Sequence, residues 1–209
     1  MRYYTAFWSS VWLWLAWLVA ASNAHADRVV LSPSGYNLPP GSLKLEVARR
    51  ESQGGLTYYW LNLGLVGGLE IETARAETSA RQIDSLSVQI NLLPDIGFTP
   101  AVSVGVRDAG DKTPNGSALY VAVAHRLPYM PPNPFIEEMY LFGGLGVGGI
   151  RGLFAGAEIR TPYRLGLTAE YDSRAWNVVL SWEPVPLVRL RLYQLDGETY
   201  YGASLALSL

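Results

Sequence analysis

The 209-residue sequence contains no cysteine and few charged residues, and both absences exclude classes of protein. Without cysteine there is no disulfide framework, no thiolate nucleophile, no cysteine zinc site and no lipidated N-terminal cysteine. Charged residues make up 16% of the chain and hydrophobic residues 49%, a balance that excludes an intrinsically disordered protein. The net charge of −2 comes without basic blocks, which excludes the electrostatic footprint of a nucleic-acid-binding protein.

The first 26 residues have the pattern of a secretory signal peptide. Arg2 is the only charged residue before Asp27, and the largely apolar run Phe7–Ala21 lies between them. Ala24 and Ala26 supply the small residues of a cleavage site, so we expect cleavage after Ala26. A retained anchor is the alternative, because the uncharged stretch approaches the roughly 20 residues of a spanning helix. We expect a signal peptide at 1–26, a Pro/Gly-rich periplasmic leader at 27–41 and a barrel at 42–209.

After the leader, apolar and polar residues alternate with a period of two. Leu86, Val88 and Ile90, for example, alternate with serine and glutamine. This period is typical of strands with one apolar and one polar face, and Gly, Pro, Asn or Asp bound the segments. The sequence therefore predicts an all-β protein of about twelve strands: 43–50, 56–63, 68–77, 82–92, 99–107, 117–126, 138–146, 150–160, 163–172, 175–183, 187–195 and 198–209.

Turn residues test whether these strands pair in a consistent register. Asp196-Gly197 favours a two-residue type I′ turn, which pairs Leu192 with Tyr201 and Arg191 with Gly202, apolar with apolar and polar with polar. A two-residue turn at 173–174 likewise pairs Asp172 with Ala175. The connection near Thr161 must be longer, because a two-residue turn there sets polar residues against apolar ones.

Composition favours a membrane barrel over a soluble sandwich. A sandwich buries the apolar face, including Val104, Leu167 and Leu190, and covers its polar face with Lys and Glu. After signal removal only two Lys but 13 Arg remain, as expected for a lumen held by guanidinium–carboxylate pairs. Trp176 and Trp182 flank an apolar outer face and are expected at the two membrane interfaces. We predict a closed antiparallel up-and-down transmembrane β-barrel of ten to twelve strands, with both chain ends on the periplasmic side.

The candidate functional residues are charged side chains on the polar face, which faces the lumen. Charge pairing explains them without catalysis, although glycoside hydrolysis by Glu158, Glu170 and Asp172 is an alternative. His125 suggests a lipid hydrolase, yet no local motif supplies a serine partner. Glycines on this face, Gly105, Gly152, Gly156, Gly166 and Gly202, are expected to make room for Arg side chains. The predicted lumen network comprises Arg107, Glu158, Arg164, Glu170, Asp172, Glu183, Arg189 and Arg191.

Five segments follow one another between about residues 66 and 185. They are Pro100–Asp108, Tyr120–Ala124, Gly143–Gly146, Leu153–Glu158 and Leu167–Asp172. In this order, with their Arg-Asp and Glu-Tyr-Asp endings, they resemble the YjbH-like family of outer-membrane proteins associated with exopolysaccharide production. Well-known members are longer, so the chain resembles one barrel module. The resemblance implies a non-enzymatic barrel linked to polysaccharide secretion or envelope assembly.

The sequence therefore predicts a non-enzymatic component of the bacterial outer membrane that serves exopolysaccharide export or envelope assembly. A passive small-solute pore and an outer-membrane lipid hydrolase are the alternatives. The expected partners are outer-membrane lipid and polysaccharide-secretion proteins. No nucleic acid, metal or cofactor is expected, and the sequence does not indicate an oligomeric state.

Overall fold

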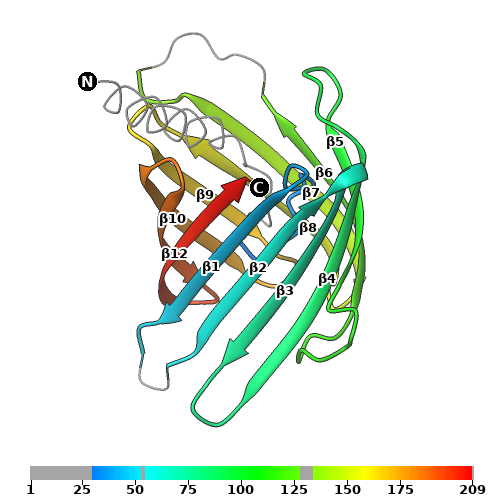
Figure 1. The fold of residues 1–209 in the computed structure, drawn as a ribbon, viewed down its shortest axis with the longest axis vertical. Helices are drawn as coiled ribbons and strands as arrows, with labels where there is room; N and C mark the ends of the chain where they lie inside the picture. Colours follow the sequence, from blue (N-terminus) through cyan, green and yellow to red (C-terminus); the bar gives the residue numbers. More distant parts are fainter. Residues whose placement is uncertain (1–29, 53–54, 128–133, 209) are drawn as a thin grey trace, which may run out of the picture.

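The chain folds into a closed antiparallel barrel (Figure 1). The computed structural model describes residues 30–52, 55–127 and 134–208, so the expected signal peptide and its cleavage site lie outside the described residues. Each strand pairs with its neighbours in sequence, and β12 pairs with β1 to close the ring. This architecture confirms the predicted all-β barrel. Within the described residues the strands are β1 Ser42–Arg50, β2 Thr57–Leu65, β3 Leu69–Glu77, β4 Gln82–Leu93, β5 Ala101–Arg107, β6 Ala118–Arg126, β7 Glu138–Gly148, β8 Gly152–Arg160, β9 Leu165–Tyr171, β10 Trp176–Val185, β11 Val188–Leu195 and β12 Glu198–Ser208.

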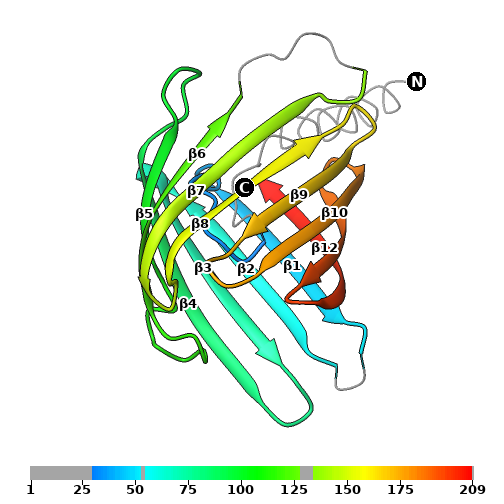
Figure 2. The same cartoon turned by 180° about the vertical axis from the view of Figure 1, so that it is seen from behind.

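The two ends of the barrel differ in what they carry. Ser42 and Ser208 are paired at one end, which we call the terminal end, at the top of Figure 1. The opposite end, the hairpin end, carries the turns that follow the odd-numbered strands. A short 3₁₀ turn, η2 (Val66–Gly68), joins β2 to β3 at the terminal end. Figure 2 shows the barrel from behind, with β6 to β10 in front.

The predicted hairpin registers are confirmed. Across β11 and β12, Leu192 pairs with Tyr201 and Arg191 with Gly202, and the turn residue Asp196 has the positive φ (47°) that a type I′ turn requires. At the β9–β10 turn the Asp172 N–H donates to the Ala175 carbonyl at 3.1 Å, as a two-residue turn demands. The β8–β9 connection is longer, residues 161–164, as the polarity pattern indicated.

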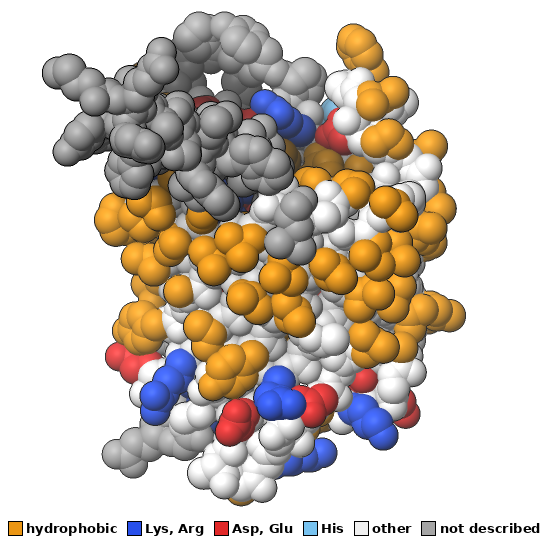
Figure 3. All heavy atoms as spheres, viewed as in Figure 1, with side chains coloured by type: hydrophobic (Ala, Val, Ile, Leu, Met, Phe, Trp, Pro, Cys, Tyr) orange, Lys and Arg blue, Asp and Glu red, His pale blue; other side chains and the backbone are white. Residues whose placement is uncertain are grey.

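The apolar face points outward from the barrel. Leu167 and Leu190 are 49% and 41% exposed instead of packed in an interior, so the sandwich alternative is excluded. Apolar side chains cover the middle of the surface in Figure 3, and charged side chains gather toward the hairpin end. Trp176 and Trp182 also lie on this face, and their placement at membrane interfaces stays a prediction. No helix of the described residues is long and apolar enough to cross a membrane.

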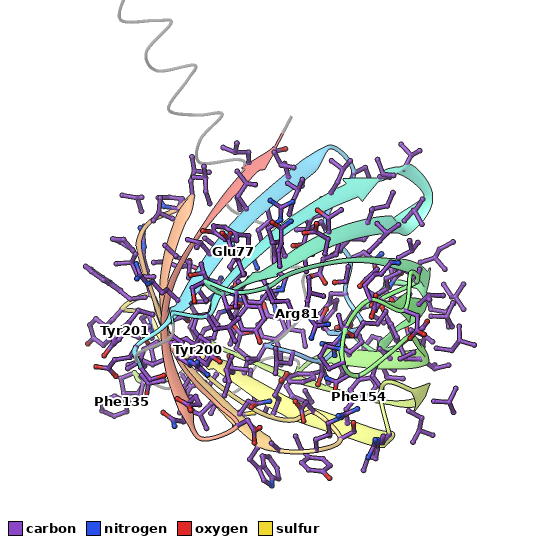
Figure 4. The ribbon with its side chains drawn as sticks, turned by 90° about the horizontal axis from the view of Figure 1, so that it is seen from below. Glu77, Arg81, Phe135, Phe154, Tyr200 and Tyr201 are labelled. Atoms are coloured by element: carbon purple, nitrogen blue, oxygen red, sulfur yellow. The ribbon has the colours of Figure 1, made fainter. Side chains whose placement is uncertain are left out.

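The lumen is filled largely by aromatic and polar side chains. Figure 4 looks along the barrel, with Tyr200 and Phe154 inside the ring of strands and Tyr201 outside it. None of the five predicted inner-face glycines faces an Arg side chain, so the prediction that they make room for Arg is wrong. A Cβ on Gly156 would collide with the ring of Phe142, its cross-strand neighbour, and Gly105 and Gly202 likewise face the rings of Tyr120 and Tyr193. Gly166 faces Ser181, and a Cβ on Gly152 would meet nothing within 4 Å. Aromatic rings laid across the lumen therefore require three of these glycines.

Candidate functional site in the barrel lumen

A cluster of ion pairs occupies the terminal half of the lumen. Glu46, with its side chain 1% exposed, accepts a hydrogen bond from Arg191 at 2.7 Å and another from the hydroxyl of Tyr193. Its second oxygen lies 2.8 Å from Lys44 Nζ. Because a buried charge is costly unless it is paired, these groups hold β1 and β11 together across the lumen face.

The remaining pairs extend this cluster toward the terminal end. Arg189 donates to Glu183 at 2.6 Å, and Arg160 donates to Glu158 at 2.6 Å. Arg160 also lies 3.8 Å from Glu138. We call the whole set the charged ring, and its members are Lys44, Glu46, Glu138, Glu158, Arg160, Glu183, Arg189 and Arg191.

The structure brings four of the predicted network residues into this ring: Glu158, Glu183, Arg189 and Arg191. Arg164 does not join them. It has φ +61° in the exposed β8–β9 turn, because strand β9 starts at Leu165, two residues later than predicted, and its carbonyl accepts the Glu183 N–H. Asp172 also lies in a turn, where it accepts the N–H groups of Arg174 and Ala175. The charge network therefore includes neither residue.

Glu170 and Arg107 bind the leader instead of each other. Glu170 is fully buried, and its two oxygens accept the N–H groups of Val30, Leu31 and Ser32. Arg107 donates to the carbonyl of Leu31 at 2.9 Å. Residues 30–38 of the segment 27–41, expected as a periplasmic leader, thus lie within the barrel, where Val30 and Leu38 are only 3% and 2% exposed.

Sequence reasoning missed four members of the charged ring and the burial of the leader. The four residues stand at inward positions of their strands, so the alternation could have identified them: Lys44, Glu46, Glu138 and Arg160. The burial of the leader had a weaker signal, because a Pro- and Gly-containing segment without periodicity predicts only irregular structure. The residues from Val30 to Leu38 give no position relative to the strands.

The hydrolase alternative finds no support in the geometry of His125. Nδ1 of His125 lies 3.3 Å from Asp95, but no serine or threonine hydroxyl bonds to this histidine among the hydrogen bonds of residues 30–52, 55–127 and 134–208. Asp95 is itself occupied by the Arg126 N–H and the Tyr36 hydroxyl. Partial burial opposes ionisation of Asp95, yet these hydrogen bonds outweigh it and hold its pKa below the ordinary value. The same described residues contain no cluster suited to a metal ion.

Comparison with solved structures identifies the architecture. The structure titled "KdgM porin" superimposes with a TM-score of 0.54 at 10% sequence identity, covering 79% of this chain and 99% of that chain. The structure titled "KdgM porin in complex with disordered oligogalacturonate" gives 0.54 at 9% identity, with the same coverage. The fold is that of an outer-membrane porin-like barrel. A NanC porin structure gives a TM-score of only 0.39 at 13% identity, covering 80% of this chain and all of that one.

No family is assigned by these comparisons. No family model matches the chain, and no curated protein matches it. The similarity to the two KdgM structures concerns the fold alone, because identity near 10% does not carry residue roles from one chain to another. These solved structures are porins rather than enzymes. The YjbH-like resemblance stays a prediction.

Proposed function

We propose that the chain forms a narrow outer-membrane pore for small hydrophilic solutes. The observation that carries this proposal is a closed barrel whose outer face is apolar and whose enclosed face is lined by polar and charged groups. A lumen of this kind offers ions and sugars hydrogen bonds that the lipid around it does not. The porin-like fold supports the same function and favours it over the exopolysaccharide role.

The charge balance of the lumen indicates weak ion selectivity. Cations and carboxylates are equal in number in the charged ring, and each cation there lies within ion-pair distance of a carboxylate. A ring of one sign would concentrate ions of the opposite sign, whereas a balanced ring does so only weakly. We therefore propose small sugars and inorganic ions as solutes. The KdgM structure with oligogalacturonate shows that a barrel of this fold can hold a saccharide.

Conductance measurements on refolded protein in planar bilayers test the proposal. The chain without residues 1–26 is refolded, and closure of the barrel is checked by heat-modifiable migration in a gel. We expect discrete channel openings with little preference between cation and anion, and swelling of liposomes in small neutral sugars. Because residues 30–38 lie inside the barrel, we expect the largest conductance when they are released.

These measurements distinguish the pore from the structural role in exopolysaccharide export. A folded barrel that gives no openings and no swelling, even with the leader released, overturns the pore and leaves the structural role in exopolysaccharide export as the better account. Loss of capsular or secreted polysaccharide on deletion of the gene, with normal uptake of small sugars, would point the same way.

A further inference from the structure

The leader crosses the lumen without being part of the barrel wall. Residues 30–38 belong to no strand, yet Val30, Ser32, Ser34 and Leu38 are all 5% exposed or less. Leu31 is held near the hairpin end, because Glu170 is the penultimate residue of β9. The Leu38 N–H is held at the terminal end, where it donates to Glu70 of β3 at 2.6 Å. The leader therefore passes along much of the depth of the barrel.

The hairpin-end contact recognises peptide backbone. One carboxylate, Glu170, accepts N–H groups from three successive residues at 2.8–3.3 Å, and Asn177 donates to the same carboxylate at 3.2 Å. Arg107 donates a hydrogen bond to the carbonyl of Leu31, which belongs to the same peptide unit as the Ser32 N–H. Because both the donor and the acceptor of one peptide unit are satisfied by ionisable side chains, and three successive N–H groups converge on one carboxylate, this is a site for a curved stretch of main chain.

The middle of the leader meets a second set of polar side chains. Gln89 donates to the Tyr36 carbonyl at 2.9 Å, and Ser103 donates to the Gly35 carbonyl at 2.7 Å. The Asn37 amide donates to the carbonyl of Gly68 at 2.7 Å. Each contact comes from a different strand or turn of the barrel, so the groove is built by the whole wall between β2 and β5.

Two close approaches show how tightly the leader fits. Gly35 has φ +79°, and a Cβ there would come within 2.9 Å of the Val123 backbone and 3.1 Å of the Ala124 side chain. A Cβ on Gly64 of β2 would collide with the carbonyl oxygens of Leu38 and Pro39. Glycine is needed on both sides of the interface, in the leader and in the wall.

One void beside the leader is small. The void lined by Leu31, Pro33 and Arg107, among others, has a volume of about 40 Å³, which holds a few water molecules but not a sugar. A sugar therefore does not fit between the leader and this part of the wall.

We propose that the lumen contains a binding groove for an irregular, bent peptide chain, and that residues 30–38 occupy it as a tethered plug. The inference rests on the proposed pore for its physiological meaning, but the groove itself is tested without it. Its ligand class is an uncharged, bent peptide segment held mainly through its main chain, with added side-chain contacts from Tyr36 and Asn37. The same chain supplies the resting occupant, so release of the plug opens the path and exposes Glu170, Arg107 and Gln89 to other ligands.

Occupancy of the groove is measured first, by cross-linking. The chain has no cysteine, so Asn37→Cys with Ser103→Cys creates one possible disulfide between side chains whose polar atoms lie 3.3 Å apart. We expect near-complete disulfide formation in the folded barrel under mild oxidation, and little in urea. A folded barrel that forms no disulfide overturns the inference whether or not the protein conducts.

Release and replacement of the plug are measured next. Gly35→Val leaves every barrel residue intact and should expel the leader, because of the strained φ and the collision with Val123. We expect cross-linking to fall and conductance to rise at least about tenfold, because the left-handed φ and the collision shift the equilibrium toward the released leader by about that factor. A synthetic peptide of residues 30–38 should then block the open channel, whereas the same peptide carrying Gly35→Val should not.

Wall variants complete the test. Glu170→Gln removes the charge that binds three N–H groups and should weaken peptide block at least about tenfold, whereas Glu77→Gln, at the hairpin end of β3 and outward-facing, should leave it unchanged. Equal conductance of the unchanged chain and Gly35→Val overturns the plug while leaving the pore intact. Cross-linking without any conductance in either chain keeps the groove and overturns the pore.

Discussion

Replacing Glu46 by glutamine tests whether the charged ring holds the barrel together. In the structure this carboxylate, 1% exposed, faces Arg191 at 2.7 Å and Lys44 at 2.8 Å, and it accepts the hydroxyl of Tyr193. Glutamine has nearly the same shape but no charge, so two buried cations lose the carboxylate that neutralises them. Breaking a buried pair costs about 3–5 kcal/mol. At the lower bound, the folding equilibrium shifts by roughly 150-fold.

Reversible urea unfolding in lipid vesicles measures this change, with heat-modifiable migration reporting barrel closure. Arg191→Gln and the double variant complete a cycle, and the double variant should lose at least about 1.5 kcal/mol less than the sum of the two single losses. Asp84→Asn provides the matched control. Its ion pair with Arg75 has similar geometry at 2.7 Å, but both side chains are about half exposed, so we expect no measurable loss.

Two results would refute the reasoning about the ring. If Glu46→Gln unfolds at the same urea concentration as the unchanged protein, water rather than the carboxylate neutralises Arg191. If the two single losses simply add, within about 0.5 kcal/mol, the two side chains do not interact and the ring is a set of independent contacts.

Three further predictions concern a turn, the membrane surface and pH. Gly197→Ala should destabilise the barrel by about 1 kcal/mol in urea, because φ at this position is +80°. Among the tryptophans of the barrel, Trp176→Phe and Trp182→Phe should reduce fluorescence quenching by brominated lipid, whereas Trp60→Phe, buried in the lumen, should not. Asp95 has a lowered pKa, so its hydrogen bonds stabilise the fold fully above its unfolded pKa of about 3.9. This stabilisation is lost as pH falls through the lower folded pKa. Cross-linking of the leader should therefore decline only in that acidic range.

The barrel could be predicted from the sequence because its pattern is local. Period-two alternation identifies the two faces of each strand, and one turn such as Asp196-Gly197 sets the register of a whole hairpin, since a slip by one residue would reverse every face. The alternation defines the ends of strands less precisely, as Arg164 shows. The expected strand included it, whereas the chain turns there, so a residue assigned to the lumen lies in an exposed turn.

The contents of the lumen could not be predicted in the same way. Alternation shows that Glu46 and Arg191 both point inward, but their partnership joins residues far apart in sequence through the β1–β12 closure, which no local pattern encodes. Glu170 was predicted on the correct face of its strand but with the wrong partner. The groups that it binds are backbone N–H groups of an irregular segment. Inward charge was predictable, whereas the identity of each partner was not.

The manner in which the leader is held makes its occupancy sensitive to small changes. Ordering a residue costs about 1–2 kcal/mol, and each hydrogen bond exchanged with water returns only about 0.5–1.5 kcal/mol, or up to about 3 kcal/mol when one partner is charged. Over residues 30–38 these opposing contributions are of similar size, so the contacts with the ionisable side chains of Glu170, Arg107, Asp95 and Glu70 weigh heavily in which state is populated. We expect a ligand that competes for Glu170 and Arg107 to loosen the hairpin-end part of the plug, while the hydrogen-bonded strands of the barrel remain unchanged.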